Sequence, residues 1–116
     1  MRLLLVDDEG ELVSTLAERL AFRGIDADWV TSGEDALKKA ETESYDLAVL
    51  DVKMPRISGI QLRDMLMIKY PDMKFIFMTG HGSENDFRAG SSEACYLVKP
   101  IGIEALVNKI NEILKD

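Results

Sequence analysis

The sequence predicts an α/β fold, a doubly wound, five-stranded parallel sheet with helices on both faces. Short apolar runs alternate along the chain with longer stretches in which apolar residues recur at helical spacing. The connections between them are short, which implies right-handed crossovers and parallel strands. Three runs are apolar at nearly every position, as in central strands that are covered on both faces. These observations fit the strand order 2-1-3-4-5.

The first part of the chain contains two predicted strands and a helix. Residues 3–6, Leu-Leu-Leu-Val, form the first apolar run. Apolar residues then recur at helical spacing over residues 12–20, and Gly24 follows as a helix stop. Residues 25–30 alternate two aspartates with apolar residues, which is typical of a half-exposed edge strand. We therefore expect the second strand at one edge of the sheet.

Capping patterns mark the beginning of the next two helices. Ser32 is followed three positions later by an acidic residue, which predicts a helix that runs to Ala40. Ser58 and Gln61 form an S-x-x-Q capping box ahead of a helix over residues 60–68. The apolar run at 47–50 between these helices predicts the third strand.

The last third of the chain repeats the alternation with one irregularity. Residues 75–78 and 95–98 predict the fourth and fifth strands, and residues 103–114 carry one apolar stripe at helical spacing. Between the two strands, Ser83 opens a helical pattern that residues 90–92, Gly-Ser-Ser, interrupt. We expect a short or irregular fourth helix.

Size and charge limit the classes of function. A chain of 116 residues with 47% hydrophobic content suits one domain, residues 1–116. A net charge of −7 argues against direct binding of nucleic acid. Cys95 is the only cysteine and lies in an apolar run, so we interpret it as a small hydrophobic residue. No apolar stretch reaches the roughly 18 residues of a membrane span, and we expect a cytoplasmic protein.

Acidic residues follow two of the apolar strands. Asp7 and Asp8 come directly after the first strand, and Asp51 follows the third. Thr79 ends the fourth strand and Lys99 follows the fifth. Because parallel strands share one end, all five side chains should converge at the carboxyl edge of the sheet, where this fold class builds its sites.

Taken singly, each acid has a structural explanation. Asp7 or Asp8 could cap the first helix, and Asp51 could end a strand in a polar turn. Together they repel, by roughly 1 kcal/mol in water for charges about 4 Å apart and about 4 kcal/mol near a protein surface. Lys99 offsets one charge, and a divalent cation would offset the rest. Mg²⁺ is the expected ion, because it prefers carboxylate and carbonyl oxygens.

Asp51 is the candidate for covalent chemistry. A carboxylate can attack phosphorus and form an aspartyl phosphate. The transfer requires positioning and stabilisation of negative charge on the phosphoryl oxygens, which Mg²⁺, Lys99 and Thr79 are suited to supply. The phosphorylated carboxylate carries more charge and would draw in Thr79 and Lys99.

With these residues in place, the chain resembles a receiver domain of two-component response regulators, in the single-domain form of the chemotaxis regulator, with a flavodoxin-like sheet. The resemblance covers the whole chain. It rests on four features: Asp7-Asp8, the segment 50–55 around Asp51 with Gly59 beyond it, Thr79-Gly80, and Lys99-Pro100.

The resemblance implies a function and a role for each residue. Asp51 would accept a phosphoryl group from a phosphohistidine on a sensor kinase or phosphotransfer protein, and the change would alter binding to a downstream effector or output domain. Asp8 and Asp51 would bind Mg²⁺ directly, Asp7 through water and Lys53 through its backbone carbonyl. Thr79 and Tyr96 would be switch residues, Thr79 through its hydroxyl. A cis peptide before Pro100 is also implied, and phosphorylation could promote a dimer.

Other interpretations remain open from the sequence. Tyr96 could simply pack against the edge of the sheet, and His81 could be a solvated loop residue. The chain could be an aspartyl-phosphate hydrolase, although such enzymes usually place an acid where Lys53 stands. A flavodoxin-like cofactor binder would need a loop rich in glycine and hydroxyl residues instead of acids. The last alternative is an interaction module that is never phosphorylated.

Overall fold

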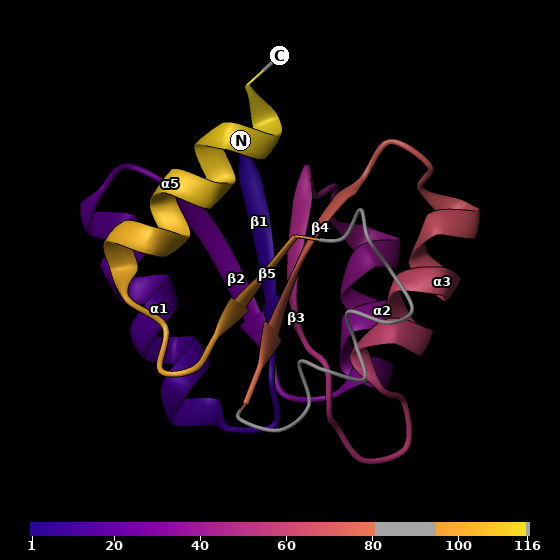
Figure 1. Ribbon diagram of the computed structural model, residues 1–116. Coiled ribbons are helices and arrows are strands. Elements are labelled where there is room, and N and C mark those ends of the chain that lie inside the picture. Colours follow the sequence, from indigo (N-terminus) through magenta and orange to yellow (C-terminus); the bar gives the residue numbers. More distant parts are fainter. Residues whose placement is uncertain (81–94, 116) are drawn as a thin grey trace.

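The computed structural model describes residues 1–80 and 95–115 and contains one parallel sheet (Figure 1). All four strand pairings are parallel, and the spatial order is β2-β1-β3-β4-β5. The predicted order and the edge position of the second strand are therefore confirmed. The strands are β1 (Arg2–Val6), β2 (Asp26–Val30), β3 (Leu47–Asp51), β4 (Lys74–Thr79) and β5 (Cys95–Val98).

Four described helices cover the two faces of the sheet. Figure 1 shows α1 and α5 on one side and α2 and α3 on the other, so the fold is doubly wound as predicted. The expected fourth helix falls within residues 81–94, which lie outside the described residues. The helices are α1 (Gly10–Phe22), α2 (Gly33–Thr42), α3 (Gly59–Lys69) and α5 (Ile103–Leu114).

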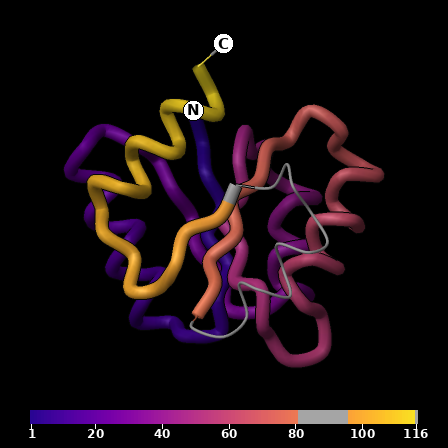
Figure 2. Tube along the Cα trace, in the orientation of Figure 1, coloured from indigo at the N-terminus to yellow at the C-terminus, as the bar shows by residue number. Residues whose placement is uncertain are grey.

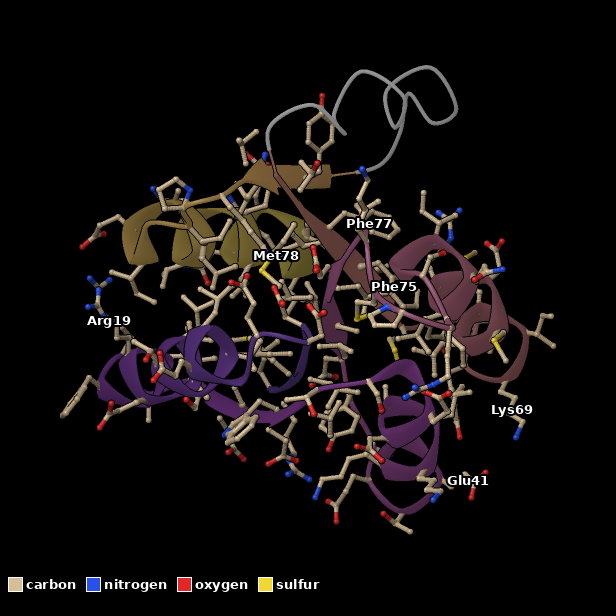
Figure 3. The ribbon with its side chains drawn as sticks, turned by 90° about the horizontal axis from the view of Figure 1, so that it is seen from below. Arg19, Glu41, Lys69, Phe75, Phe77 and Met78 are labelled. Carbon is tan, nitrogen blue, oxygen red and sulfur yellow. The ribbon has the colours of Figure 1, made fainter. Side chains whose placement is uncertain are left out.

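Each face of the sheet has its own apolar core, because successive strand residues point to opposite sides. Figure 3 shows this on β4, where Met78 points toward α1 and α5 and Phe77 toward α3. Leu5 of β1 belongs to the first core, whereas its neighbour Leu4 belongs to the second. Burial on both faces explains why these strands read as continuous apolar runs.

The predicted helix caps form as expected. The Ser32 hydroxyl accepts a hydrogen bond from the backbone N–H of Asp35 at 3.1 Å. Ser58 and Gln61 exchange the two hydrogen bonds of a capping box, at 3.1 and 3.0 Å. Gly24 lies just beyond α1 with φ of 77°, the left-handed conformation that ends many helices. Local sequence therefore sets these boundaries.

The edge strand β2 differs from its simple alternating pattern. Trp29 is 44% exposed, although its position in the alternation would assign it to the covered side. It lies at the end of β2, beside the first turn of α1, where the helix covers only part of the ring. An edge strand is incompletely covered near its ends, and this accounts for the exposure.

Both ends of the described chain lie away from the carboxyl ends of the strands. Figure 2 shows Met1 next to the end of α5, at the opposite end of the molecule. No helix among the described residues is long and apolar enough to cross a membrane.

Candidate functional site

Parallel pairing brings the ends of four strands together at one edge. Val6 pairs with Leu50, so Asp7 follows β1 at the level where Asp51 ends β3. Thr79 ends β4, and it pairs with Val98 on β5, which directly precedes Lys99. The register thus places the predicted residues on adjacent strands.

The three predicted acids converge. Asp7, Asp8 and Asp51 each offer a carboxylate oxygen, and these oxygens lie within 4.8 Å of one another. Asp7 is fully buried and Asp51 is 6% exposed, whereas Asp8 is exposed. A group of carboxylates that is open on one side is the kind of site that holds Mg²⁺.

Lys99 provides the positive charge closest to the two buried acids. Its Nζ lies 2.7 Å from Oδ2 of Asp7 and 3.5 Å from Oδ1 of Asp51. It also lies 3.0 Å from Oε1 of Glu9. The expected compensation by Lys99 is therefore present, and it is shared among three carboxylates.

Burial controls the protonation of the site. It raises the pKa of Asp51 to about 6, the negative charge of Asp7 adds to the rise, and Lys99 opposes it. Burial likewise raises the pKa of Asp7 against the opposing contact with Lys99. For Lys99, burial disfavours the charged form, but Asp7 and Glu9 outweigh it and the pKa is raised. The ammonium therefore stays charged while the two buried carboxylates are held at an energetic cost.

Thr79 is buried at the end of β4, directly beside these groups. Its hydroxyl donates a hydrogen bond to the carbonyl of Gly80 at 3.1 Å, and its own carbonyl accepts one from the backbone N–H of Lys99 at 2.8 Å. The second bond ties the loop after β5 to the end of β4. The Lys99–Pro100 peptide is cis, as the resemblance implied.

Two other predicted residues are described by their exposure and packing. The Lys53 side chain is exposed in the loop after Asp51. Tyr96 is partly buried on β5 and packs against the core on the α2 and α3 side. His81 lies outside the described residues.

The backbone after Asp51 passes very close to the start of α3. A Cβ on Gly59 would lie 2.2 Å from the Asp51 carbonyl oxygen, so only glycine fits there. The N–H of Gly59 donates to the carbonyl of Val52 at 3.0 Å, and the N–H of Val52 to that of Met78 at 2.9 Å. This loop holds Asp51 against the end of β4.

Glu9 also belongs to the site, although the sequence pattern predicts no role for it. It lies directly after the two aspartates, and its contact with Lys99 spans 90 positions in the sequence. The acidic triplet Asp7-Asp8-Glu9 indicates that Glu9 lies near the site. No local pattern indicates which of the three acids contacts Lys99.

The comparison with protein families identifies the domain. The model for the response regulator receiver domain matches residues 3–111. The chain belongs to this family. Receiver domains are phosphoacceptor signalling modules of two-component systems rather than enzymes that act on a separate substrate, and this domain is one of them.

Curated and solved relatives support the assignment. The chain is 34% identical over 116 residues to the alkaline phosphatase synthesis transcriptional regulatory protein PhoP of Bacillus subtilis, covering 98% of this chain and 48% of that protein. The chain thus spans about half the length of this relative. The response regulator TrrA of Thermotoga maritima, solved with Mg²⁺ and BeF, is 35% identical with a TM-score of 0.83 over 97% of this chain and 98% of that one. TrrA has also been solved with the histidine kinase ThkA, and that chain is 34% identical with a TM-score of 0.81, covering 97% of both.

Proposed function

We propose that Asp51 is the phosphoacceptor of this receiver domain. The observation that carries the proposal is the position of its carboxylate, nearly buried at the end of β3, close to two further acids and 3.5 Å from the Lys99 ammonium. Asp7 is fully buried and in closer contact with Lys99, and Asp8 is exposed, so Asp51 is the acid best suited to react.

The donor set fits Mg²⁺, because three carboxylate oxygens lie within 4.8 Å and Asp7 and Asp51 are costly to ionise without a cation. Asp8 and Asp51 would bind the ion directly, Asp7 through water and Lys53 through its backbone carbonyl. When bound, Mg²⁺ neutralises the carboxylates and the oxygens of the incoming phosphoryl group.

The chain's own residues perform the transfer. An Asp51 oxygen forms the new bond to phosphorus while the bond from phosphorus to the donor histidine nitrogen breaks, and that nitrogen retains the electron pair. The Lys99 ammonium, already 3.5 Å from Asp51, binds a phosphoryl oxygen. The Thr79 hydroxyl turns from the Gly80 carbonyl to another phosphoryl oxygen, and Tyr96 on β5 changes its packing in response.

The proposal includes the partners of the domain. The donor is a sensor histidine kinase or a histidine phosphotransfer protein, as the TrrA complex with ThkA suggests. The recipient of the signal is a downstream effector or an output domain, and no direct contact with nucleic acid is proposed. Phosphorylation-dependent dimerisation, a cytoplasmic location and a single domain over residues 1–116 remain predictions.

Intact mass after incubation with acetyl phosphate tests the proposal. Wild type should gain one phosphoryl group only when Mg²⁺ is present, and Asp51→Asn should gain none. An equal adduct in Asp51→Asn, or none in wild type under any Mg²⁺ concentration, would reject Asp51 as the acceptor.

A further inference from the structure

The site contains an ion pair that the transfer described above does not use. Lys99 Nζ lies 3.0 Å from the Glu9 carboxylate and 3.5 Å from Asp51. An ammonium has three protons to donate, and three carboxylates surround it here, so a phosphoryl oxygen can bind Lys99 only in place of one of them. Asp51, the acid proposed to react, has the longest of the three contacts.

The backbone of Glu9 is held in place, although its side chain is 66% exposed. Its N–H donates to Oδ1 of Asp7 at 2.8 Å. Its carbonyl accepts from the N–H groups of Leu12 and Val13 at the start of α1, at 3.1 and 3.3 Å. Glu9 is therefore anchored to the buried acid and to the helix, and its carboxylate is positioned over Lys99.

We propose that Glu9 is a positioning residue that holds Lys99 away from Asp51 in the unphosphorylated domain and thereby slows phosphoryl transfer. The inference rests on the proposed role of Asp51 and Lys99. Lys99 must exchange its contact with Glu9 for one with the phosphoryl group as the new bond forms. The phosphorylated domain has already made this exchange, so Glu9 affects gain of the phosphoryl group and has little effect on its loss.

Replacement by glutamine isolates the charge of Glu9. Glu9→Gln keeps the length and an acceptor oxygen but removes the ion pair. An exposed ion pair changes an equilibrium by about two- to fivefold, and we expect the rate constant of phosphorylation to rise by that factor. The rate constant of phosphoryl loss should remain within experimental error. Added salt should narrow the difference between Glu9→Gln and wild type by screening the pair.

Glu11→Gln is the matched control. Glu11 lies two residues further on in the first turn of α1, is exposed, and makes no ion pair with Lys99 in the described structure. The Glu11→Gln substitution removes one negative charge from the start of α1, as Glu9→Gln does. Any general effect of charge on an anionic donor should therefore appear in both variants.

The measurement has two parts. The first records the side-chain resonances of Lys99 by NMR in the metal-free, unphosphorylated domain, with Lys99→Arg used for assignment. The second measures gain and loss of the phosphoryl group with phosphoramidate, whose phosphorus–nitrogen bond breaks and whose nitrogen leaves as ammonia.

The proposal expects Glu9→Gln, but not Glu11→Gln, to shift the Lys99 resonances and to speed phosphorylation. Equal effects of the two variants, or an unchanged or slower rate in Glu9→Gln, would overturn it. If wild type takes up no phosphoryl group, the proposed function fails and the effect on rate fails with it. The resonance comparison would still decide whether Glu9 holds Lys99.

Discussion

The Asp51 carboxylate is ionised at a cost to the folded state. Its pKa is raised to about 6 from an ordinary 3.8, mainly by burial and then by Asp7. A difference of this size corresponds to about 3 kcal/mol of stability lost when Asp51 is charged. A cation bound beside Asp51 would offset this cost.

Asp51→Asn should therefore stabilise the metal-free domain in a pH-dependent way. Below about pH 3 the Asp51 carboxyl is protonated in both the folded and the unfolded chain, and the two proteins should be about equally stable. Between about pH 4 and pH 6 the unfolded chain loses this proton more readily than the folded one, so wild type loses stability relative to the variant, and the difference levels off at about 3 kcal/mol by about pH 8. Urea unfolding in chelator at several pH values measures this difference, and Mg²⁺ should reduce it.

Asp72→Asn provides the control for this comparison. Asp72 is exposed in the turn before β4, so the same charge is removed away from the site. The difference in free energy of unfolding between Asp72→Asn and wild type should not show the pH dependence expected for Asp51→Asn. If wild type is more stable than Asp51→Asn in chelator at pH 8, the charged Asp51 carboxylate does not destabilise the metal-free domain, and the prediction is wrong.

The sequence predicts the positions of the three site aspartates, but it predicts only some of the contacts made at the site. Asp7, Asp8 and Asp51 are placed by strand ends alone, because parallel strands share an edge. Lys99 follows the same rule. The contact of Glu9 with Lys99 depends on which way a side chain at the start of α1 turns, and no local pattern encodes that direction.

Three of the described helices begin with glycine, and the space available to an added Cβ differs among them. Gly10, Gly33 and Gly59 are the first residues of α1, α2 and α3. An added Cβ would lie 2.2 Å from the Asp51 carbonyl oxygen at Gly59 and 2.7 Å from the Ile57 side chain at Gly33. At Gly10 the closest atom, on Thr31, would be 3.5 Å away, an ordinary contact.

Alanine at these equivalent positions should separate close packing from helix propensity. Gly59→Ala should lower the free energy of unfolding by about 2 kcal/mol or more, since the rigid backbone of β3 must move. Gly33→Ala should also lower the free energy of unfolding, because the closest atom is Cβ of Ile57, which can move only together with the backbone of the loop before α3. Gly10→Ala should be neutral or stabilising by up to about 0.5 kcal/mol. Urea unfolding measures all three, and a neutral Gly59→Ala would refute the close approach.

The elements themselves were largely predictable, because periodicity, capping residues and apolar runs agree with one another. The capping box of Ser58 and Gln61 is an example in which four residues determine a helix start. The exposure of Trp29 was not predictable from alternation, since it depends on how far α1 covers the end of an edge strand. The irregular fourth helix remains a prediction.

At the scale of the whole molecule, the charged site has a counterpart at the other end of the sheet. Arg2 forms ion pairs with Asp28 at 2.6 Å, with Asp26 at 3.3 Å and with Glu43. Its guanidinium also lies over the Tyr45 ring, whose hydroxyl donates to Asp28 at 2.6 Å. This arginine ties the start of β1 to β2 and to the loop before β3, far from Asp51.

Arg2→Met should lower stability without changing phosphorylation. Methionine replaces the aliphatic stem of Arg2 but not its guanidinium. Three acids then lie close together without their cation, so unfolding should require less urea. Salt should reduce the loss by screening the remaining repulsion. Arg19→Met, on the outer surface of α1 in Figure 3, is the control and should have little effect. A reduced phosphorylation rate in folded Arg2→Met would contradict the independence of the two ends.

We expect the phosphoryl group to reside on Asp51, and locating the modified residue distinguishes Asp51 from Asp7 and Asp8. Borohydride reduces an aspartyl phosphate to homoserine, which peptide sequencing by mass spectrometry can place. After reaction with acetyl phosphate and Mg²⁺, we predict homoserine at position 51 alone. Homoserine at position 7 or 8, or at no position in a chain that gained a phosphoryl group, would contradict the account.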